Sequence, residues 1–364
     1  MSWQKVVIKL GTSSLTDDLG RIFPPKLWAI ARAVQVLQQE KDCKVVIVSS
    51  GAGAAGRERL GIELPLTLPD KQAAAAVGQA LLMLDWAKAL APLPVAQLLL
   101  SASDIKERER YINAKNALEA SLKLGAIPIV NENDSVATSE IKLGDNDTLS
   151  AWTAQLINAD ILIILTDVDG LYDSNPRENS NAKRIEVVKD IAEVESFAGN
   201  AGSQRGTGGM VTKIKAAKIA TQAGIETIII GGGGAGLEAI AKDRINGTRF
   251  LAQPKTRAKK AWLSQQDESG RIIIDAGALK ALKNGKSLLP SGIIQIEGEF
   301  AFGDVVALIC NEKIVARGLS NYSTESLNLI KGKQSNEIRK ILGHKDYDEV
   351  IHRDNMALIK DKYE

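Results

Sequence analysis

Two lysines, each beside a turn of small residues, are the side chains in this sequence best suited to chemistry on phosphate. Lys9 and Gly11 follow the apolar run Val6–Ile8, and Lys213 ends the run Gly206-Thr-Gly-Gly-Met-Val-Thr-Lys. Small residues let backbone N–H groups approach a phosphate chain, a helix N-terminus adds partial positive charge, and each ammonium group adds a full one. The pair predicts phosphoryl transfer, with two ordinary surface lysines as the alternative.

Acids and amides gather in two neighbouring stretches, Asn131–Ser135 and Gly144–Thr148. We expect Asp134 and Asp145 to bind the ammonium group of a substrate. We expect Asp147 to pair with both lysines and hold them in position. The alternative is that these are polar loops in which Asp147 only caps the helix that follows, because Asp and Asn are favoured at turns and helix N-termini.

Two further turns follow apolar runs. Thr166 and Asp167 come directly after Ile161–Leu165, and Ser50 opens the small-residue turn Ser50–Gly56. The first turn suits contact with a nucleotide, or is a plain exit from a strand. The second suits a carboxylate or the transferred phosphoryl group, or reflects tight helix packing. The sequence contains no Walker A pattern, and the residues from Gly206 do not form G-x-G-x-x-G, which disfavours a P-loop NTPase or a Rossmann dehydrogenase.

The scaffold for these residues is an alternation of short β-branched runs and longer segments of helical period. Strands are expected at Val6–Lys9, Val45–Val48, Val95–Leu99, Ile127–Val130, Ile161–Leu165 and Thr227–Ile230. Helices are expected near 26–40, 70–90, 104–123, 148–158 and 210–223. Runs that are apolar on both faces predict an α/β fold, a three-layer αβα sandwich with a mainly parallel sheet. Such sheets bind ligands at the carboxyl ends of their strands, where the residues named above lie.

The alternation of strand-like and helix-like segments ends near residue 251, and a basic stretch begins at Pro254. From Arg271 onward, short apolar runs are separated by Gly, Asp and Asn, which predicts a small mainly-β barrel. We therefore divide the chain into residues 1–255, a linker at 256–270, a second domain at 271–355 and a tail at 356–364. The glycine run Gly231–Gly234 is interpreted as a loop or flexible joint.

Composition narrows the class of protein. The chain has 364 residues, of which 45% are hydrophobic and 25% charged, typical of a globular protein of two domains. No apolar run is long enough to span a membrane and no signal peptide is evident, so we expect a cytoplasmic protein. The net charge of +2 does not by itself support nucleic-acid binding. Cys43 and Cys310 match no metal or redox spacing, and we expect no metal held by the protein.

Together the motifs resemble the amino acid kinase family, and within it the glutamate 5-kinases. The resemblance rests on Val6–Ser13, Val48–Ala52, Asn131–Asp134, Gly144–Asp147, Thr166–Tyr172 and Gly206–Lys213. The segments Gly285–Ile293 and Gly303–Val305 resemble the PUA domain that bacterial forms carry. The implied reaction is ATP-dependent phosphorylation of the γ-carboxylate of L-glutamate to γ-glutamyl phosphate, the first step of proline biosynthesis, with Mg²⁺ bound to the nucleotide.

The resemblance also implies roles for individual residues. Lys9, Lys213 and Asp147 would be catalytic, with Asp147 organising the lysines. Glutamate would contact Ser50, Asp134 and Asn146, and Asp145 belongs to the same substrate-side loop. ATP would contact Lys9, Thr166, Asp167, Thr207, Gly208, Gly209, Met210, Val211, Thr212 and Lys213.

The resemblance also implies partners for the protein, and it leaves alternative functions open. The resemblance implies a homo-oligomer, feedback inhibition by proline and handover of the acyl phosphate to γ-glutamyl phosphate reductase. N-acetylglutamate kinase and aspartokinase are the nearest enzymatic alternatives. A free amino acid is favoured because Asp134 or Asp145 can pair with its ammonium group, which an N-acetylated substrate lacks. The remaining alternative is an RNA-binding protein acting through the PUA-like domain.

Overall fold

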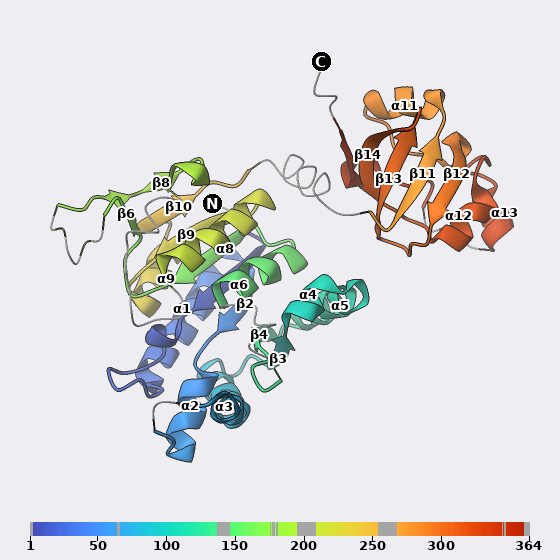
Figure 1. Cartoon of the computed structure of the whole chain (residues 1–364). Coiled ribbons are helices and arrows are strands. Elements are labelled where there is room, and N and C mark those ends of the chain that lie inside the picture. The colour runs from blue at the N-terminus through green and yellow to red at the C-terminus, as the bar shows by residue number, and fades with distance from the viewer. Residues whose placement is uncertain are drawn as a thin grey trace. The chain divides into compact units, whose positions relative to one another are not determined.

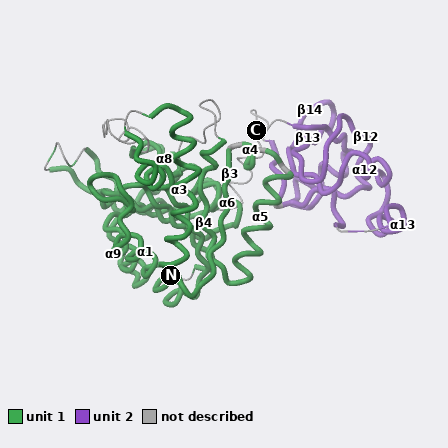
Figure 2. Tube along the Cα trace, turned by 90° about the horizontal axis from the view of Figure 1, so that it is seen from below, with its two compact units in different colours: residues 1–253 green, residues 254–364 purple. Residues whose placement is uncertain are grey.

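The computed structural model describes residues 3–63, 66–136, 146–174, 176, 179, 181–194, 209–253, 268–343, 345 and 347–359. The chain divides into two compact units, residues 1–253 and residues 254–364 (Figure 2). The first unit contains the residues singled out for phosphate chemistry. The second contains the run of short strands.

The first unit is built on an eight-stranded sheet in the order β3-β4-β2-β1-β5-β9-β10-β8 (Figure 1). The strands are β1 (Lys5–Leu10), β2 (Lys44–Ser49), β3 (Val95–Leu100), β4 (Ile127–Glu132), β5 (Ile161–Leu165), β8 (Val187–Val188), β9 (Glu226–Ile230) and β10 (Gly247–Phe250). The pairs from β3 to β9 are parallel, whereas β10 runs antiparallel to β9. The six strands predicted from apolar runs are confirmed, each within two residues of its predicted ends.

Helices join these strands in chain order, and a two-stranded ribbon stands apart from the sheet. The helices are α1 (Pro24–Lys41), α2 (Ala52–Leu60), α3 (Leu68–Ala89), α4 (Ala102–Lys106), α5 (Arg108–Lys123), α6 (Asn146–Leu156), α8 (Met210–Gln222) and α9 (Gly233–Ala241). The ribbon consists of β6 (Leu171–Tyr172) and β7 (Arg184–Ile185). The single helix expected over 104–123 is divided, because Glu107 adopts an extended backbone between α4 and α5.

Successive side chains along the central strands point to opposite faces of the sheet, and so they enter two separate cores. On β1, Val6, Ile8 and Leu10 pack with α1, α3 and α9, whereas Val7 packs with α5, α6 and α8. The same division holds on β5, where Ile163 faces the first core and Ile164 the second. Burial on both faces explains the uninterrupted apolar runs and confirms the three-layer αβα arrangement.

The glycine run after β9 is not the joint that we expected from sequence. Gly232 has a φ of 78°, a left-handed value that suits glycine, and it caps α9, whose first residue is Gly233. A Cβ on Gly234 would lie 2.6 Å from the carbonyl oxygen of Ala29 in α1. The glycines therefore permit a sharp turn and close packing between α1 and α9.

The second unit contains a five-stranded sheet in the order β12-β11-β13-β14-β15. Its elements are β11 (Gly270–Ile274), α11 (Ala276–Lys283), β12 (Ile293–Gly298), β13 (Val305–Cys310), β14 (Lys313–Leu319), α12 (Thr324–Ile330), α13 (Ile338–Leu342) and β15 (Met356–Leu358). A separate hydrophobic core lies between the sheet and the helices. Residues 356–358 pair with β14 and so belong to this sheet rather than to a tail.

Among the described residues, no helix combines the length and the apolar character needed to cross a bilayer.

Candidate active site

Predicted site residues from four described turns lie at the carboxyl edge of the sheet because neighbouring parallel strands end there together. Gly11 follows β1, Ser50 follows β2, Asp134 lies just beyond β4 and Thr166 follows β5. The backbone N–H of Ser50 donates to the carbonyl oxygen of Leu10, and that of Thr166 donates to Ile230, so sheet pairing continues to the first loop residues. The first residues of the loops after β2 and β5 are therefore held by the sheet itself.

Because side chains alternate between the two faces of a strand, Lys9 lies on the face of the sheet that α6 and α8 cover. Lys9 shares that face with Val7, two residues earlier in β1. Asp147 is the second residue of α6, and Lys213 is the fourth residue of α8. The three side chains therefore reach one point from three elements.

The carboxylate of Asp147 is the centre of this arrangement. Lys9 Nζ lies 2.5 Å from Asp147 Oδ1, and Lys213 Nζ lies 3.2 Å from Oδ2. The hydroxyl of Thr212 donates to Oδ2 across 2.7 Å. The predicted pairing of Asp147 with both lysines is present in the structure.

Positive groups outnumber negative ones among these three side chains. Burial opposes ionisation of Asp147, but the ammonium groups of Lys9 and Lys213 outweigh it and hold the pKa of Asp147 below its usual value. Two ammonium groups and one carboxylate leave a net charge of about +1, and Lys9 and Lys213 are only 5% and 6% exposed. Two ammonium groups beside the N-terminus of α8 make the cluster suited to an anionic ligand.

The predicted nucleotide side is partly within the described chain. Gly209 caps α8, and Met210, Val211, Thr212 and Lys213 form its first turn. Thr166 is buried and donates its hydroxyl hydrogen to Asp167 at the end of β5. Thr207 and Gly208 lie outside the described residues. The described part offers a helix N-terminus with Lys213, a combination that favours phosphate binding.

The predicted substrate side centres on Ser50 and Asn146. Asn146 Nδ2 donates to Ser50 Oγ across 2.8 Å and to Asn131 Oδ1 across 3.1 Å. Gly51, with a φ of 106°, turns the chain from β2 into α2 beside them. Asp145 lies outside the described residues. The structure thus brings Ser50 and Asn146 together one residue away from Asp147.

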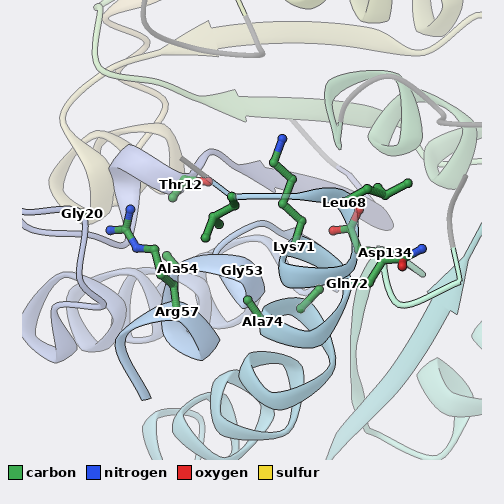
Figure 3. Close-up of a pocket in the computed structure, with 12 residues that line it drawn as sticks. Thr12, Gly20, Gly53, Ala54, Arg57, Leu68, Lys71, Gln72, Ala74 and Asp134 are labelled. Carbon is green, nitrogen blue, oxygen red and sulfur yellow. The ribbon is translucent and has the colours of Figure 1, made fainter. Parts of the chain in front are cut away.

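Asp134 lines a cavity of about 380 Å³ that is also lined by residues of α2 and α3 (Figure 3). Thr12 from the turn after β1, Arg57 from α2 and Lys71 from α3 line the same cavity. No acidic side chain of the described residues forms an ion pair with Arg57 or Lys71. A space lined by two cations and one carboxylate is suited to a small ligand that carries both signs of charge.

Sequence reasoning missed three groups in the site. It assigned Thr212 only to the nucleotide, whereas its hydroxyl also contacts Asp147. It missed Gln79, whose Oε1 accepts from Asn131 Nδ2 across 2.9 Å, and the cationic lining by Arg57 and Lys71. The only local signal for Arg57 and Lys71 is a cationic residue beside a helix of small residues. Ordinary surface lysines and arginines have the same signal.

Comparison with known proteins agrees with the geometry. The model of the amino acid kinase family matches residues 4–231, and the model of the PUA domain matches residues 270–342. Glutamate 5-kinase of Moorella thermoacetica is 47% identical over 365 residues, covering 98% of this chain and 96% of that protein. Glutamate 5-kinase of Haemophilus influenzae is 45% identical over 368 residues, covering 99% and 100%.

A solved structure shares the fold of the first unit. Carbamate kinase from Giardia lamblia, bound to AMP-PNP, superposes with a TM-score of 0.50 at 16% identity, covering 69% of this chain and 99% of that one. The sheet order, the two covering layers and the full-length relatives lead to one conclusion. The chain belongs to the amino acid kinase family and carries a mainly-β domain that matches the PUA family.

Proposed function

We propose that this protein phosphorylates the γ-carboxylate of L-glutamate with ATP, giving γ-glutamyl phosphate and ADP, the first step of proline biosynthesis. The observation that carries the proposal is the buried cluster in which Lys9 and Lys213 share Asp147. Full-length similarity to glutamate 5-kinases supports the choice of substrate.

The reaction needs alignment and charge neutralisation more than proton transfer. A glutamate carboxyl group, with an ordinary pKa of about 4.3, is already ionised near neutral pH, so no general base is required. A carboxylate oxygen forms the new bond to the γ-phosphorus, while the bond from that phosphorus to the bridging oxygen breaks and ADP leaves. Lys9 and Lys213 would stabilise the charge on the phosphoryl oxygens during the transfer.

Asp147 would act by orienting the two lysines. Its carboxylate is engaged by two ammonium groups and the Thr212 hydroxyl, so it is poorly placed to serve as a metal ligand. The described residues also contain no group of three side chains suited to holding a metal ion. We therefore propose that Mg²⁺ enters bound to the phosphates of ATP, where it neutralises part of their charge.

Free glutamate fits the charges that line the cavity in Figure 3. Asp134 would bind the α-ammonium group, and Arg57 or Lys71 would bind the α-carboxylate. An N-acetylated substrate has no ammonium group and would place a neutral amide against Asp134, which disfavours that substrate. These roles, with those of Ser50 and Asn146 toward the γ-carboxylate, form the substrate half of the proposal.

The test is ATP-dependent formation of acyl phosphate, trapped as a hydroxamate, with glutamate, N-acetylglutamate and aspartate compared at equal concentrations. We expect a clear preference for glutamate and loss of activity when EDTA removes Mg²⁺. A preference for either of the other substrates would keep the phosphoryl chemistry and refute the assignment of Asp134. Absence of activity with all three would refute the proposed function.

Four partner relations are proposed only by analogy with the family. Inhibition by proline predicts glutamate kinetics that respond to millimolar proline. A homo-oligomer predicts a mass above that of one chain by light scattering at assay concentration. Handover to γ-glutamyl phosphate reductase predicts faster product capture when that enzyme is present. RNA binding by the second unit would appear as a salt-sensitive complex independent of Lys9.

A further inference from the structure

A chain of side-chain amides runs from the edge of the sheet to the substrate side of the site. Gln79 Nε2 in α3 donates to Gln97 Oε1 in β3 across 3.3 Å, and Asn131 Nδ2 donates to Gln79 Oε1 across 2.9 Å. Asn146 Nδ2 donates to Asn131 Oδ1 and to Ser50 Oγ. The chain thus connects exposed Gln97 with the loop after β2.

One backbone group sets the direction of every bond in this chain. The N–H of Glu132 donates to Asn131 Oδ1 across 2.9 Å, and a backbone N–H can act only as a donor. Asn131 must therefore present its oxygen to Glu132 and to Asn146, and its NH₂ group to Gln79. Gln79 must then present its oxygen to Asn131, and Asn146 must present its NH₂ group to Asn131 and Ser50.

This direction decides what Ser50 and Asn146 can offer to a ligand. Ser50 Oγ accepts a hydrogen bond from Asn146, so its own hydrogen is left to donate, and no acceptor for it lies among the described residues. An O–H donor at the end of a strand suits an anionic oxygen. Asn146 Oδ1 is buried and has no hydrogen-bond partner in the part of the chain that the structure describes.

We propose that Gln79 is a positioning residue: by holding Asn131 it fixes Asn146, and thereby directs the Ser50 hydroxyl hydrogen toward the substrate carboxylate. The inference rests on the proposed function, because it takes the ligand of Ser50 to be a carboxylate. Gln79 is only 7% exposed and Asn131 only 2%. Loss of the Gln79 oxygen would leave a buried NH₂ group of Asn131 unpaired, which strongly disfavours its present orientation.

The test is a double-mutant cycle of Gln79→Met and Ser50→Ala, read as kcat/KM for glutamate. Gln79→Met alone is expected to lower kcat/KM roughly tenfold, with the KM for ATP unchanged within about twofold. In the Ser50→Ala background the same substitution is expected to change kcat/KM by less than about twofold, because the hydroxyl that Gln79 positions is absent.

Two variants serve as controls. Gln97→Met removes the outer bond of the chain and is expected to have a smaller effect than Gln79→Met, since Gln79 still meets Asn131. Gln35→Met removes a glutamine that donates to the backbone of Leu90, away from the site, and is expected to leave kinetics unchanged. If Gln79→Met fails to fold, Gln79→Asn, which shortens the side chain and withdraws the same oxygen, replaces it in the cycle.

The inference would be overturned if Gln79→Met lowered kcat/KM by the same factor in the unmodified protein and in the Ser50→Ala variant. A role that does not act through Ser50 would give that result, because its effect is independent of the Ser50 hydroxyl. Failure of the proposed function looks different: the unmodified protein itself would not phosphorylate glutamate. In that case the cycle is run with whichever carboxylate substrate the unmodified protein accepts, and the same comparison decides.

Discussion

Lys9 Nζ lies 2.5 Å from Asp147 Oδ1, and neither side chain exposes more than 7% of its surface. Removing one member of a buried ion pair typically costs about 3–5 kcal/mol, because the remaining charge is left uncompensated. Here Asp147→Asn would leave two lysines facing each other. We expect it to lower kcat on the order of 10²- to 10³-fold and to lower the free energy of unfolding by about 3 kcal/mol.

These two effects are measured separately, by steady-state kinetics and by urea unfolding. Asp160→Asn is the matched control, because Asp160 accepts backbone N–H groups of Gln4 and Lys5 at the opposite end of β1. It should lower stability and spare kcat. An Asp147→Asn variant with full turnover would refute the role of Asp147.

The same carboxylate predicts how stability depends on pH. The pKa of Asp147 is lowered from its ordinary value of 3.8 in the folded protein. A lowered folded pKa contributes stability above the unfolded pKa, and the contribution is lost as pH falls through the folded pKa. The difference in unfolding free energy between the unmodified protein and Asp147→Asn should be constant from about pH 7 to 5 and should shrink below about 3.8. A difference that grows on acidification would contradict this.

The two lysines should matter to turnover and less to folding than Asp147 does, because removing one lysine leaves the carboxylate paired with the other. Lys9→Met and Lys213→Met keep most of the aliphatic stem and remove the charge. Each is expected to lower kcat on the order of 10²- to 10³-fold, the usual effect of losing a donor to developing charge. Lys5→Met is the control on the same strand, since Lys5 pairs with Glu119 away from the site. Unchanged kcat in either site variant, with circular dichroism showing a folded protein, would exclude that lysine from catalysis.

Arg57 provides a test of the substrate side that is independent of the lysines. If Arg57 binds the α-carboxylate, Arg57→Met should raise the KM for glutamate roughly 10-fold or more and leave the KM for ATP unchanged. Arg59→Met, on the exposed face of the same helix, should change neither. If Arg57→Met and Arg59→Met had equal KM values for glutamate, Arg57 would not be a residue that binds the substrate.

The location of the site could be predicted because it follows from local patterns. Val6–Ile8 and Ile161–Leu165 are continuous apolar runs, and such runs indicate parallel strands whose carboxyl ends share one edge. That rule brings Lys9, Ser50 and Thr166 together without any knowledge of distances. The alternation of side chains along a strand also predicts the face of the sheet on which Lys9 lies.

The amide chain could not be predicted, for a physical reason. Gln79 and Asn131 are 52 residues apart in sequence, and their contact depends on where α3 crosses the sheet. In sequence, Gln79 is one polar residue in an alanine-rich helix and resembles a surface position. The start of α9 was mispredicted for a related reason, because glycine weakens a helix locally and only the close approach of α1 explains its presence there.

Gly56 of α2 and Gly78 of α3 are in close contact, and Arg57 and Lys71 from the same two helices line the cavity in Figure 3. A Cβ on Gly78 would lie 1.8 Å from the carbonyl oxygen of Ala52 and 2.4 Å from the nitrogen of Gly56. Both are backbone atoms, so Gly78→Ala must push the helices apart. We expect it to lower the free energy of unfolding by about 1–3 kcal/mol and to raise the KM for glutamate more than that for ATP.

Gly53→Ala is the matched control for the stability part of this prediction only, because Gly53 itself lines the cavity. Gly53 lies in α2 as well, but a Cβ there would meet no heavy atom within 4 Å. Because alanine is the better helix former, Gly53→Ala should raise the free energy of unfolding by about 0.5–1 kcal/mol. If Gly78→Ala destabilised the protein yet left both KM values unchanged, the spacing of α2 and α3 would be a matter of packing alone, and the cavity that these helices help to line would not be the glutamate site.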